Sequence, residues 1–413
     1  MLPTVPAPTK SLGDYVEAAG EEAVERLRAA AEPLRGARVL HVNSTAFGGG
    51  VAELLLTHVP LLNDLGIETT WAVLEGSDEF FAVTKTIHNA LQGAEVEWTP
   101  HMEDVYRERV RANAAQLDEG FDIVFIHDPQ PAAILEVLED EGRRMGTWAW
   151  RCHIDLSAPF EPVWRFVAPV VERYDGAVFT MEEYLQPGFS GPALAFVPPS
   201  IDPLSTKNCP VSAETRHDVL MRYGVDSRRP ILTQVSRFDP WKDPIGVIDA
   251  YRLAKKEVPD LQLVMAGSMA HDDPEGMRYL DLTAEHAGGD PDVHMLTDFE
   301  GVGNLEVNVL QHASTVIVQK SVREGFGLVV AEAMWKERPV VGGNVGGIRL
   351  QIEDGASGFL VDSVEDCAER VVTLLLDADL RAHMGRSAHE RVRERFLSLR
   401  ELDDELRFFA SLR

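Results

Sequence analysis

Two glutamates frame a glycine-rich turn in the second half of the chain, and their spacing could support chemistry on a sugar phosphate. Glu324 precedes a Gly-Phe-Gly-Leu turn at residues 325–328, and Glu332 lies eight residues after the first glutamate. The β-branched run at residues 315–318 predicts a buried strand before the turn, and residues 328–336 predict a helix after it. The first turn of a helix has unpaired N–H donors and a positive dipole end, which bind phosphate. Carboxylates bind hydroxyl groups, so this turn suits a ligand that carries phosphate and several hydroxyls.

Two cations on another loop could hold the phosphates of such a ligand. Arg237 and Lys242 lie between a predicted strand at residues 231–236 and a predicted helix that begins at residues 243–244, an Asp-Pro pair typical of a helix start. The formal net charge of −28 would repel an anionic ligand unless basic residues reverse the field locally. We therefore expect this pair to point into the same crevice as the glycine-rich turn and to clamp a diphosphate.

A triple glycine near the N-terminus forms a second strand-to-helix turn. A predicted strand at residues 38–43 leads to Gly48, Gly49 and Gly50, and a helix is predicted at residues 51–65. Strand, glycine loop and helix are the outline of a phosphate- or sugar-binding turn. The spacing differs from the Gly-x-Gly-x-x-Gly fingerprint, so no nicotinamide site is predicted. A tight turn without a ligand is an equally good interpretation of these residues alone.

Two polar clusters that contain histidine follow later strands of the first half. His127 and Asp128 follow one predicted strand, and His153 and Asp155 follow the next. Ligands of open α/β sheets bind beyond the carboxyl ends of the strands. A single histidine is more often structural, but two such clusters at the edge where a pocket should lie favour a functional site.

Strands and helices alternate along the chain, which predicts α/β domains with mostly parallel sheets. Further strands are predicted at residues 68–74, 122–127, 147–153, 176–180, 195–197, 262–266, 292–295, 339–342 and 359–361. Further helices are predicted at residues 21–34, 213–223 and 365–376, and residues 402–412 are amphipathic. The proline-rich residues 1–10 are expected to be loosely held, and the four prolines within residues 198–210 predict a linker between the two halves.

Composition excludes several classes of partner. A chain of 413 residues has room for about two or three domains, and its net charge disfavours nucleic acid and anionic membrane as partners. No apolar run approaches the length of a membrane span, and the N-terminus lacks the order of a signal peptide. The three cysteines, Cys152, Cys209 and Cys367, lie far apart without a Cys-x-x-Cys pair, which indicates a reducing cytoplasm.

The Glu-x7-Glu pattern around Gly-Phe-Gly resembles the donor-binding signature of retaining glycosyltransferases of family 4. These enzymes have the GT-B fold, in which two Rossmann-like α/β domains face each other across a deep cleft. The resemblance covers nearly the whole chain. It implies an acceptor-side domain at residues 1–203, a nucleotide-sugar-binding domain at residues 204–395, and a C-terminal helix at residues 396–413 that packs back on the first domain.

The resemblance also implies a role for each candidate residue. The donor would be held by Gly48, Gly49, Gly50, Arg237, Lys242, Glu324, Gly325, Phe326, Gly327, Leu328 and Glu332. In that set the two cations would bind the diphosphate, Glu324 the sugar hydroxyls and Glu332 the ribose. The catalytic residues would be Glu324, His153, Arg237 and Lys242, with His153 near the reacting face of the sugar. The candidates for the acceptor are His127, Asp128 and Asp155. No metal site is implied and no cofactor is required, although a magnesium ion carried with the nucleotide is compatible with such a site.

Four longer strings resemble one subgroup of that family, the trehalose glycosyltransferring synthases. They occupy residues 127–131, 150–157, 199–205 and 332–336. Lys320 and the pair Arg349-Leu350 depart from the broad family pattern, in which a proline and a Pro-Glu pair are common, but they are not catalytic positions.

The subgroup resemblance implies transfer of glucose from ADP-, UDP- or GDP-glucose to C1 of free glucose, giving α,α-trehalose with retention in a reversible reaction. In the family's usual proposal, attack occurs on the same face and the leaving phosphate takes the acceptor's proton. Two alternatives stay open: a retaining trehalose phosphorylase of the same fold that uses inorganic phosphate, and a non-catalytic sugar-nucleotide-binding protein. A homodimer is compatible with the sequence.

Overall fold

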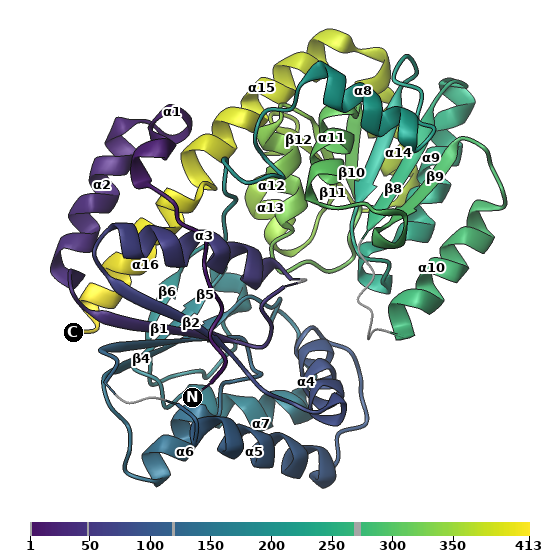
Figure 1. Cartoon of the computed structure of the whole chain (residues 1–413). Helices are drawn as coiled ribbons and strands as arrows, with labels where there is room; N and C mark the ends of the chain where they lie inside the picture. The colour runs from purple at the N-terminus through teal and green to yellow at the C-terminus, as the bar shows by residue number, and fades with distance from the viewer. Residues whose placement is uncertain (1, 48, 118–119, 268–273) are drawn as a thin grey trace. The chain divides into compact units, whose positions relative to one another are not determined.

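The computed structural model describes residues 2–47, 49–117, 120–267 and 274–413, and the chain forms two compact units (Figure 1). The first unit consists of Met1–Ser200 together with Ser398–Arg413, and the second unit is Ile201–Leu397. The chain therefore leaves the first unit once and returns to it for its last helix. None of the helices among the described residues combines the length and the apolar character needed to cross a membrane.

The first unit is built on a parallel sheet of six strands in the order β2-β1-β3-β4-β5-β6. Its strands are β1 (Arg38–Asn43), β2 (Glu68–Val73), β3 (Ile123–His127), β4 (Thr147–Cys152), β5 (Gly176–Phe179) and β6 (Ala193–Phe196). The central strands are apolar on both faces because helices cover both sides of the sheet. This agrees with the predicted α/β class and with most of the predicted strand positions.

Different helices cover the two faces of the first sheet (Figure 1). One face packs on α2 (Glu21–Ala31), α3 (Gly50–Asp64) and the C-terminal helix α16 (Ser398–Ser411), through a core that includes Val39, Phe125, Leu402 and Phe409. The other face packs on α4 (Asp78–Leu91), α5 (Pro100–Ala114), α6 (Ile134–Asp140) and α7 (Glu161–Val171). Side chains alternate between the two faces along a strand. Every second side chain of β1, β3 and β4 therefore points to the face that α16 covers.

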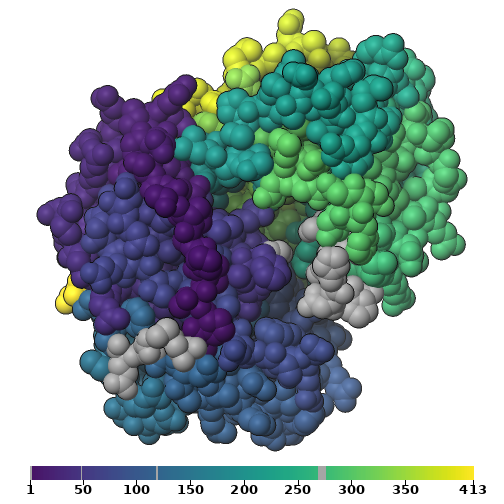
Figure 2. Space-filling view, viewed as in Figure 1, coloured from purple at the N-terminus to yellow at the C-terminus, as the bar shows by residue number. Residues whose placement is uncertain are grey.

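Residues 2–5 of the N-terminal segment pair with the rest of the first unit, so the expectation of a loosely held start is wrong for them, while Met1 lies outside the described residues. Thr4 pairs antiparallel with Ala72 of β2, the N–H of Val5 donates to the carbonyl of Trp71, and the N–H of Val73 donates to that of Pro3. In Figure 2 the purple N-terminal residues run over the surface of the first unit. The segment covers the edge strand β2, and proline is tolerated there because one side of an edge strand needs no donor.

The second unit is also built on six parallel strands, in the order β12-β11-β10-β7-β8-β9. Its strands are β7 (Ile231–Val235), β8 (Gln262–Gly267), β9 (Val293–Thr297), β10 (Val316–Gln319), β11 (Val340–Gly343) and β12 (Gly358–Val361). Helices α8 (Ala213–Arg222) and α11 (Asn304–Ala313) pack on one face, and α9 (Pro244–Glu257) and α14 (Val364–Leu376) pack on the other. The remaining helices are α10 (Pro274–Ala287), α12 (Leu328–Trp335), α13 (Gly346–Gln351) and α15 (Ala378–Arg395).

The proline-rich segment predicted as a linker is folded from Ile201 onward. The side-chain amide of Asn308 donates to the carbonyls of Thr206 at 2.8 Å and Cys209 at 2.9 Å. Asn208 is buried and accepts a hydrogen bond from Lys336 at 2.9 Å. Side-chain donors thus satisfy the backbone of this irregular segment, which makes it part of the second unit.

Candidate functional site

Many of the candidate residues lie where each sheet reverses its strand order, whereas Glu332 lies on α12, and His153 and Asp155 follow β4. The reversal falls between β1 and β3 in the first unit and between β7 and β10 in the second. The carboxyl ends of these four strands and the segments that follow them carry Gly49 and Gly50, His127 and Asp128, Arg237 and Lys242, and the turn at residues 324–327. In open α/β sheets ligands bind beyond the carboxyl ends of the strands at such reversals.

The glycine-rich turn presents an uncapped helix N-terminus. Gly327 precedes α12 with a left-handed φ of 82°, and no side chain caps the helix. The amide of Gln351 donates to the carbonyls of Phe326 at 2.6 Å and Gly327 at 3.2 Å, which fixes the turn. Gly347 packs against the turn so closely that a Cβ would lie 2.4 Å from the Cα of Phe326. The first N–H groups of α12, beginning at Leu328, are therefore held ready for an anion.

Lys242 and Glu324 meet at this turn. The ammonium of Lys242 donates to Oε2 of Glu324 at 2.6 Å, and the hydroxyl of Ser321 donates to the same oxygen at 3.0 Å. The Lys242 backbone is fixed as well: its N–H donates to Asp239 Oδ1 at 3.2 Å and its carbonyl accepts from Gln234 at 2.8 Å. A cation, a carboxylate and a helix N-terminus thus occupy one corner of the second unit.

Arg237 is less constrained than Lys242. Its side chain is 51% exposed, and its guanidinium lies 3.4 Å from Oδ2 of Asp239, on the same loop. The guanidinium is therefore free to turn toward a bound anion while its backbone stays in place.

Glu332 is buried on α12 and belongs to a hydrogen-bond chain. The ammonium of Lys336 donates to Oε1 of Gln311 at 2.8 Å, and the amide of Gln311 lies 3.3 Å from Oε2 of Glu332. The ammonium of Lys207 lies 3.6 Å from the other carboxylate oxygen. Burial lowers the pKa of Lys336 to about 7. The amide of Gln311 and the ammonium of Lys207 thus orient this carboxylate, as a ligand for paired hydroxyls would require, and Lys336 holds Gln311 in place.

In the first unit, three histidines form a row: two lie on the adjacent strands β1 and β3, and the third directly follows β4. Nδ1 of His41 lies 3.0 Å from Nε2 of His127, and Nδ1 of His127 lies 3.0 Å from Nε2 of His153. Phe125 packs against the first two rings. Both ring nitrogens of His127 face neighbouring imidazoles, so His127 would act on an acceptor through His153. His153 is the outermost ring and is partly exposed.

The two aspartates predicted for the acceptor also shape the backbone. Asp128 has a left-handed φ of 65°, and its Oδ1 accepts the backbone N–H of His153 at 2.8 Å. Burial raises the pKa of Asp128 to about 7. Oδ1 of Asp155 accepts the backbone N–H of Ser157 at 2.9 Å. A non-glycine residue in the left-handed region at a site costs energy that the surrounding contacts must offset.

A quartet of buried charges ties α16 to the same face of the sheet. Arg151 of β4 binds Glu405, and it binds Glu401 at 2.5 Å. His58 of α3 lies 3.5 Å from an oxygen of each glutamate. Burial alone would lower the pKa of His58, but the two carboxylates outweigh it and raise the pKa to about 9. Burial opposes ionisation of Glu401, yet Arg151 and His58 hold its pKa below the usual range. The quartet is therefore two cations paired with two anions.

The quartet contains the one group of three metal-type ligands found among the described residues, His58, Glu401 and Glu405. Arg151 already binds an oxygen of each glutamate, and together with protonated His58 it balances their charge. The group is an ion-pair network rather than a metal centre.

The triple-glycine loop is described in part. Gly48 lies outside the described residues. Gly49 precedes α3 with an extended backbone, Gly50 is its first residue, and no side chain caps this helix. Phe47 before it is 79% exposed. The loop thus supplies a second helix N-terminus, at the carboxyl end of β1.

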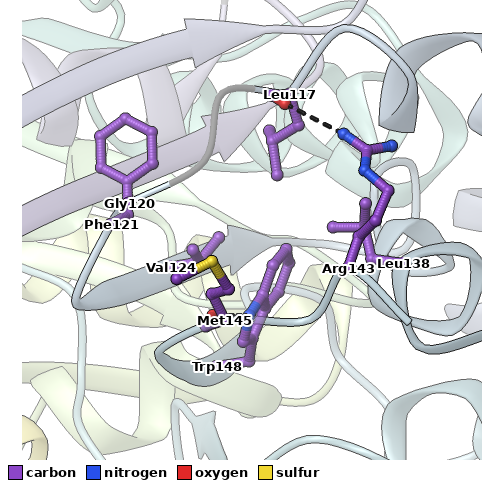
Figure 3. Close-up of a pocket in the computed structure, with 8 residues that line it drawn as sticks. All are labelled: Leu117, Gly120, Phe121, Val124, Leu138, Arg143, Met145 and Trp148. Carbon is purple, nitrogen blue, oxygen red and sulfur yellow. Dashed lines mark hydrogen bonds between the residues drawn. The ribbon is translucent and has the colours of Figure 1, made fainter. Parts of the chain in front are cut away.

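Two hollows of the first unit lie at the opposite edge of the sheet. Figure 3 shows one of about 20 Å³, with room for little more than a water molecule. A larger one of about 380 Å³ lies beside the amino ends of β3 and β4 and the C-terminal Leu412 and Arg413. Neither hollow contains a predicted site residue.

Sequence reasoning missed His41, His58, Glu401 and Glu405 and did not give Arg151 a role. A signal was present: Glu401 and Glu405 stand four residues apart, beside Leu402 and Leu406 on the buried side of an amphipathic helix. Charges on such a face need buried partners. Where those partners lie depends on the fold.

A pH dependence of stability follows from the buried imidazoles. Burial lowers the pKa of His41 to about 4 and holds the pKa values of His127 and His153 well below 6.5. Near pH 5.5 the unfolded chain therefore binds nearly three protons that the folded unit does not, while folded Asp128 binds one that the unfolded chain does not. The net of just under two protons predicts that the free energy of unfolding falls by about 2 kcal/mol per pH unit on acidification near pH 5.5.

The alkaline side is governed by His58. Its raised pKa means that its contribution is fully present below pH 6.5 and is lost as the pH rises through about 9. Tryptophan fluorescence can follow both limbs, because five of the seven tryptophans lie in the first unit: Trp71, Trp98, Trp148, Trp150 and Trp164. His58→Gln should remove the alkaline limb and leave the acid limb. A flat profile from pH 6.5 to 4.5 would contradict the assignment of neutral buried histidines.

Comparisons with known proteins agree with this arrangement. Residues 41–186 match the family model described as trehalose synthase, N-terminal domain, and residues 220–391 match glycosyl transferases group 1. A trehalose synthase of Rubrobacter xylanophilus is 50% identical, covering 100% of this chain and 99% of its own. One from Thermococcus litoralis is also 50% identical, covering 95% of each chain. A trehalose phosphorylase of Pleurotus pulmonarius is 26% identical over 84% of this chain and 54% of its own.

Solved structures share the fold at low identity. A trehalose-phosphate synthase of Burkholderia xenovorans in complex with glucose-6-phosphate superposes with a TM-score of 0.74 at 13% identity, covering 91% of this chain and 100% of that one. The Anabaena protein HepE in complex with UDP and glucose gives a TM-score of 0.67 at 17% identity, with the same coverage of 91% and 100%. These likenesses confirm the predicted class, two Rossmann-like units of the GT-B type.

Proposed function

This chain belongs to the trehalose synthase family and is a trehalose-forming hexosyltransferase, and from that premise we propose that its donor is a nucleoside diphosphate glucose and its acceptor is free glucose. The observation that supports the donor most directly is the corner formed by Lys242, Glu324 and the uncapped start of α12. A diphosphate needs cations and N–H donors, and a hexose needs a carboxylate.

In this proposal each group acts on charge that develops during transfer. The anomeric carbon becomes oxocarbenium-like while negative charge grows on the leaving phosphate. Lys242, Arg237 and the first N–H groups of α12 stabilise that phosphate, and no protein nucleophile is used. Glu324 and the backbone of residues 325–328 fix the donor glucose. His153 contacts the transferred sugar. The acceptor glucose attacks the anomeric carbon on the face that the leaving phosphate occupies, and its hydroxyl proton passes to a phosphate oxygen.

Glu332 favours a nucleotide over bare phosphate as the activating group. It is a buried carboxylate oriented by Gln311 and Lys207, and it suits the paired hydroxyls of a ribose. A carboxylate would repel inorganic phosphate, which a phosphorylase must bind. The reaction is proposed to be reversible, and its substrates are cytoplasmic metabolites.

The test is to incubate the protein with glucose and ADP-, UDP- or GDP-glucose in turn. We expect α,α-trehalose by NMR and one nucleoside diphosphate released per trehalose with at least one donor. Glu332→Gln should raise the KM for that donor with less effect on kcat, because a ribose contact is made equally in the ground and transition states. Formation of glucose 1-phosphate from trehalose and phosphate without nucleotide would support the phosphorylase instead. Tight donor binding without turnover would support a binding protein.

A further inference from the structure

The row of three histidines has nearly linear hydrogen bonds. The ring centroids of His41 and His127 are 5.3 Å apart with planes inclined by 19°, and those of His127 and His153 are 5.3 Å apart at 18°. Each centroid separation is close to the 3.0 Å N···N distance plus the two ring radii, so the nitrogens point directly at each other. Linear geometry gives the strongest hydrogen bonds.

Such a row has only two arrangements of protons when all three rings are neutral. A neutral imidazole has one N–H donor and one acceptor nitrogen. If Nδ1 of His41 donates, then His127 must carry its proton on Nδ1, and so must His153. If His153 donates from Nε2, all three rings carry their protons on Nε2. The tautomer of the outermost ring is therefore coupled to that of the innermost.

The buried end of the row selects between the two arrangements. Nε2 of His41 is buried and has no hydrogen-bond partner within the part of the chain that the structure describes. A buried N–H without a partner is rarer and more costly than an unused acceptor. This nitrogen therefore carries no proton, and the proton of His41 lies on Nδ1.

The nearby charges do not reverse this choice. The negative field of Glu405 would attract a proton to the buried end of His41. Arg151 and His58 pair with Glu405, however, and balance its charge. Asp128 holds the backbone of His153 rather than its ring.

We propose that His41 and His127 are positioning residues for glucosyl transfer, because their hydrogen-bonded row holds the ring of His153 and fixes its proton on Nδ1. His153 then presents an N–H donor, at the carboxyl edge of the sheet, to an oxygen of the donor glucose. The inference rests on the proposed function, since the contact of His153 with the sugar does.

The proton positions can be measured without substrate. In protein labelled with 15N-histidine, we expect Nδ1 of His153 and His127 to be protonated, Nε2 of both rings to be unprotonated, and N–N couplings across both hydrogen bonds. Single His→Asn variants assign the signals. A protonated Nε2 on His153 would overturn the proposal. This readout does not depend on activity, so it fails separately from the proposed function.

A matched pair of variants then tests the consequence for catalysis. The amide of His41→Asn can donate from the place of Nδ1, whereas His41→Leu cannot. We expect His41→Leu to leave the proton of His153 shared between its nitrogens and to lower kcat by roughly 10- to 100-fold, the range typical of losing a partner that orients a functional histidine. His41→Asn should restore the native His153 signals and recover most of the lost kcat. Equal loss of kcat in two folded variants, with unchanged His153 signals, would show a merely structural role.

Discussion

Arg151→Met is expected to lower the free energy of unfolding of the first unit by about 3–5 kcal/mol. The guanidinium is buried against Glu401 and Glu405, and it also donates to the carbonyl of Val197 at 3.1 Å. Methionine fills similar space but leaves two carboxylates with His58 as their remaining cation. An uncompensated charge away from water is far more costly than the loss of an ion pair at the surface.

Urea unfolding followed by tryptophan fluorescence measures this effect, since most tryptophans belong to the first unit. Arg165→Met is the matched control: Arg165 also pairs with a glutamate, Glu161, but its side chain is 75% exposed. The control should leave the transition where it is. If both variants shift the midpoint equally, the quartet does not stabilise the fold as described.

The quartet also explains why α16 belongs to the first unit. Leu402, Leu406 and Phe409 would pack on many apolar surfaces, and apolar packing tolerates small shifts in register. Glu401 and Glu405 allow only the register that brings both to Arg151 and His58. Adding Glu401→Gln and Glu405→Gln to Arg151→Met should recover part of the lost stability, because the buried charges are then absent.

The sequence predicted those parts of the fold that local pattern determines. The strands came from short β-branched runs such as residues 38–43 and 231–236, which form β1 and β7 nearly as expected. The start of α9 followed from Asp243 and Pro244, and Asp243 does cap the helix by accepting the N–H of Gly246 at 3.1 Å. In these cases the residues that determine the strand or the helix start are neighbours in the sequence.

Long-range pairing was not readable in the same way. Residues 2–5 looked like a free proline-rich start, yet they pair with β2, about seventy positions further on. Lys320, which stands where the resembled family commonly has proline, forms a partly buried ion pair with Asp243. That pair joins the loop after β10 to the loop after β7. No local rule connects two residues so far apart, although the sheet places their strands side by side.

The candidate site shows both cases. Lys242 and Glu324 each follow a strand of the same sheet, and these positions predicted that both lie at one edge of it. Their direct contact at 2.6 Å depends instead on η4 (Pro240–Lys242), which turns the lysine inward. The same loop leaves Arg237 half exposed. Position after a strand predicts the edge on which a residue lies, but not the direction of its side chain.

Lys242→Ala is expected to lower kcat/KM for the nucleotide sugar by about 10²–10³-fold, roughly 2.7–4 kcal/mol in the barrier. The ammonium is mostly buried, with a side chain 17% exposed, beside Glu324 near the start of α12, where it would meet charge growing on the leaving diphosphate. In the free protein it is balanced by Glu324, so its loss also leaves that carboxylate with Ser321 as a hydrogen-bond partner. The rate of transfer is measured from the nucleoside diphosphate released in reactions that are stopped at a series of times.

Lys256→Ala is the matched control, because Lys256 lies exposed in the last turn of α9, the helix that Lys242 precedes. It should keep the native rate. Calorimetry with the nucleoside diphosphate alone separates the two roles of Lys242: a variant that binds the product weakly has lost the clamp, whereas one that binds it normally but turns over slowly has lost only the orientation of Glu324. If Lys242→Ala binds the nucleoside diphosphate and turns over as the native protein does, the diphosphate is not held at the corner beside Gly327.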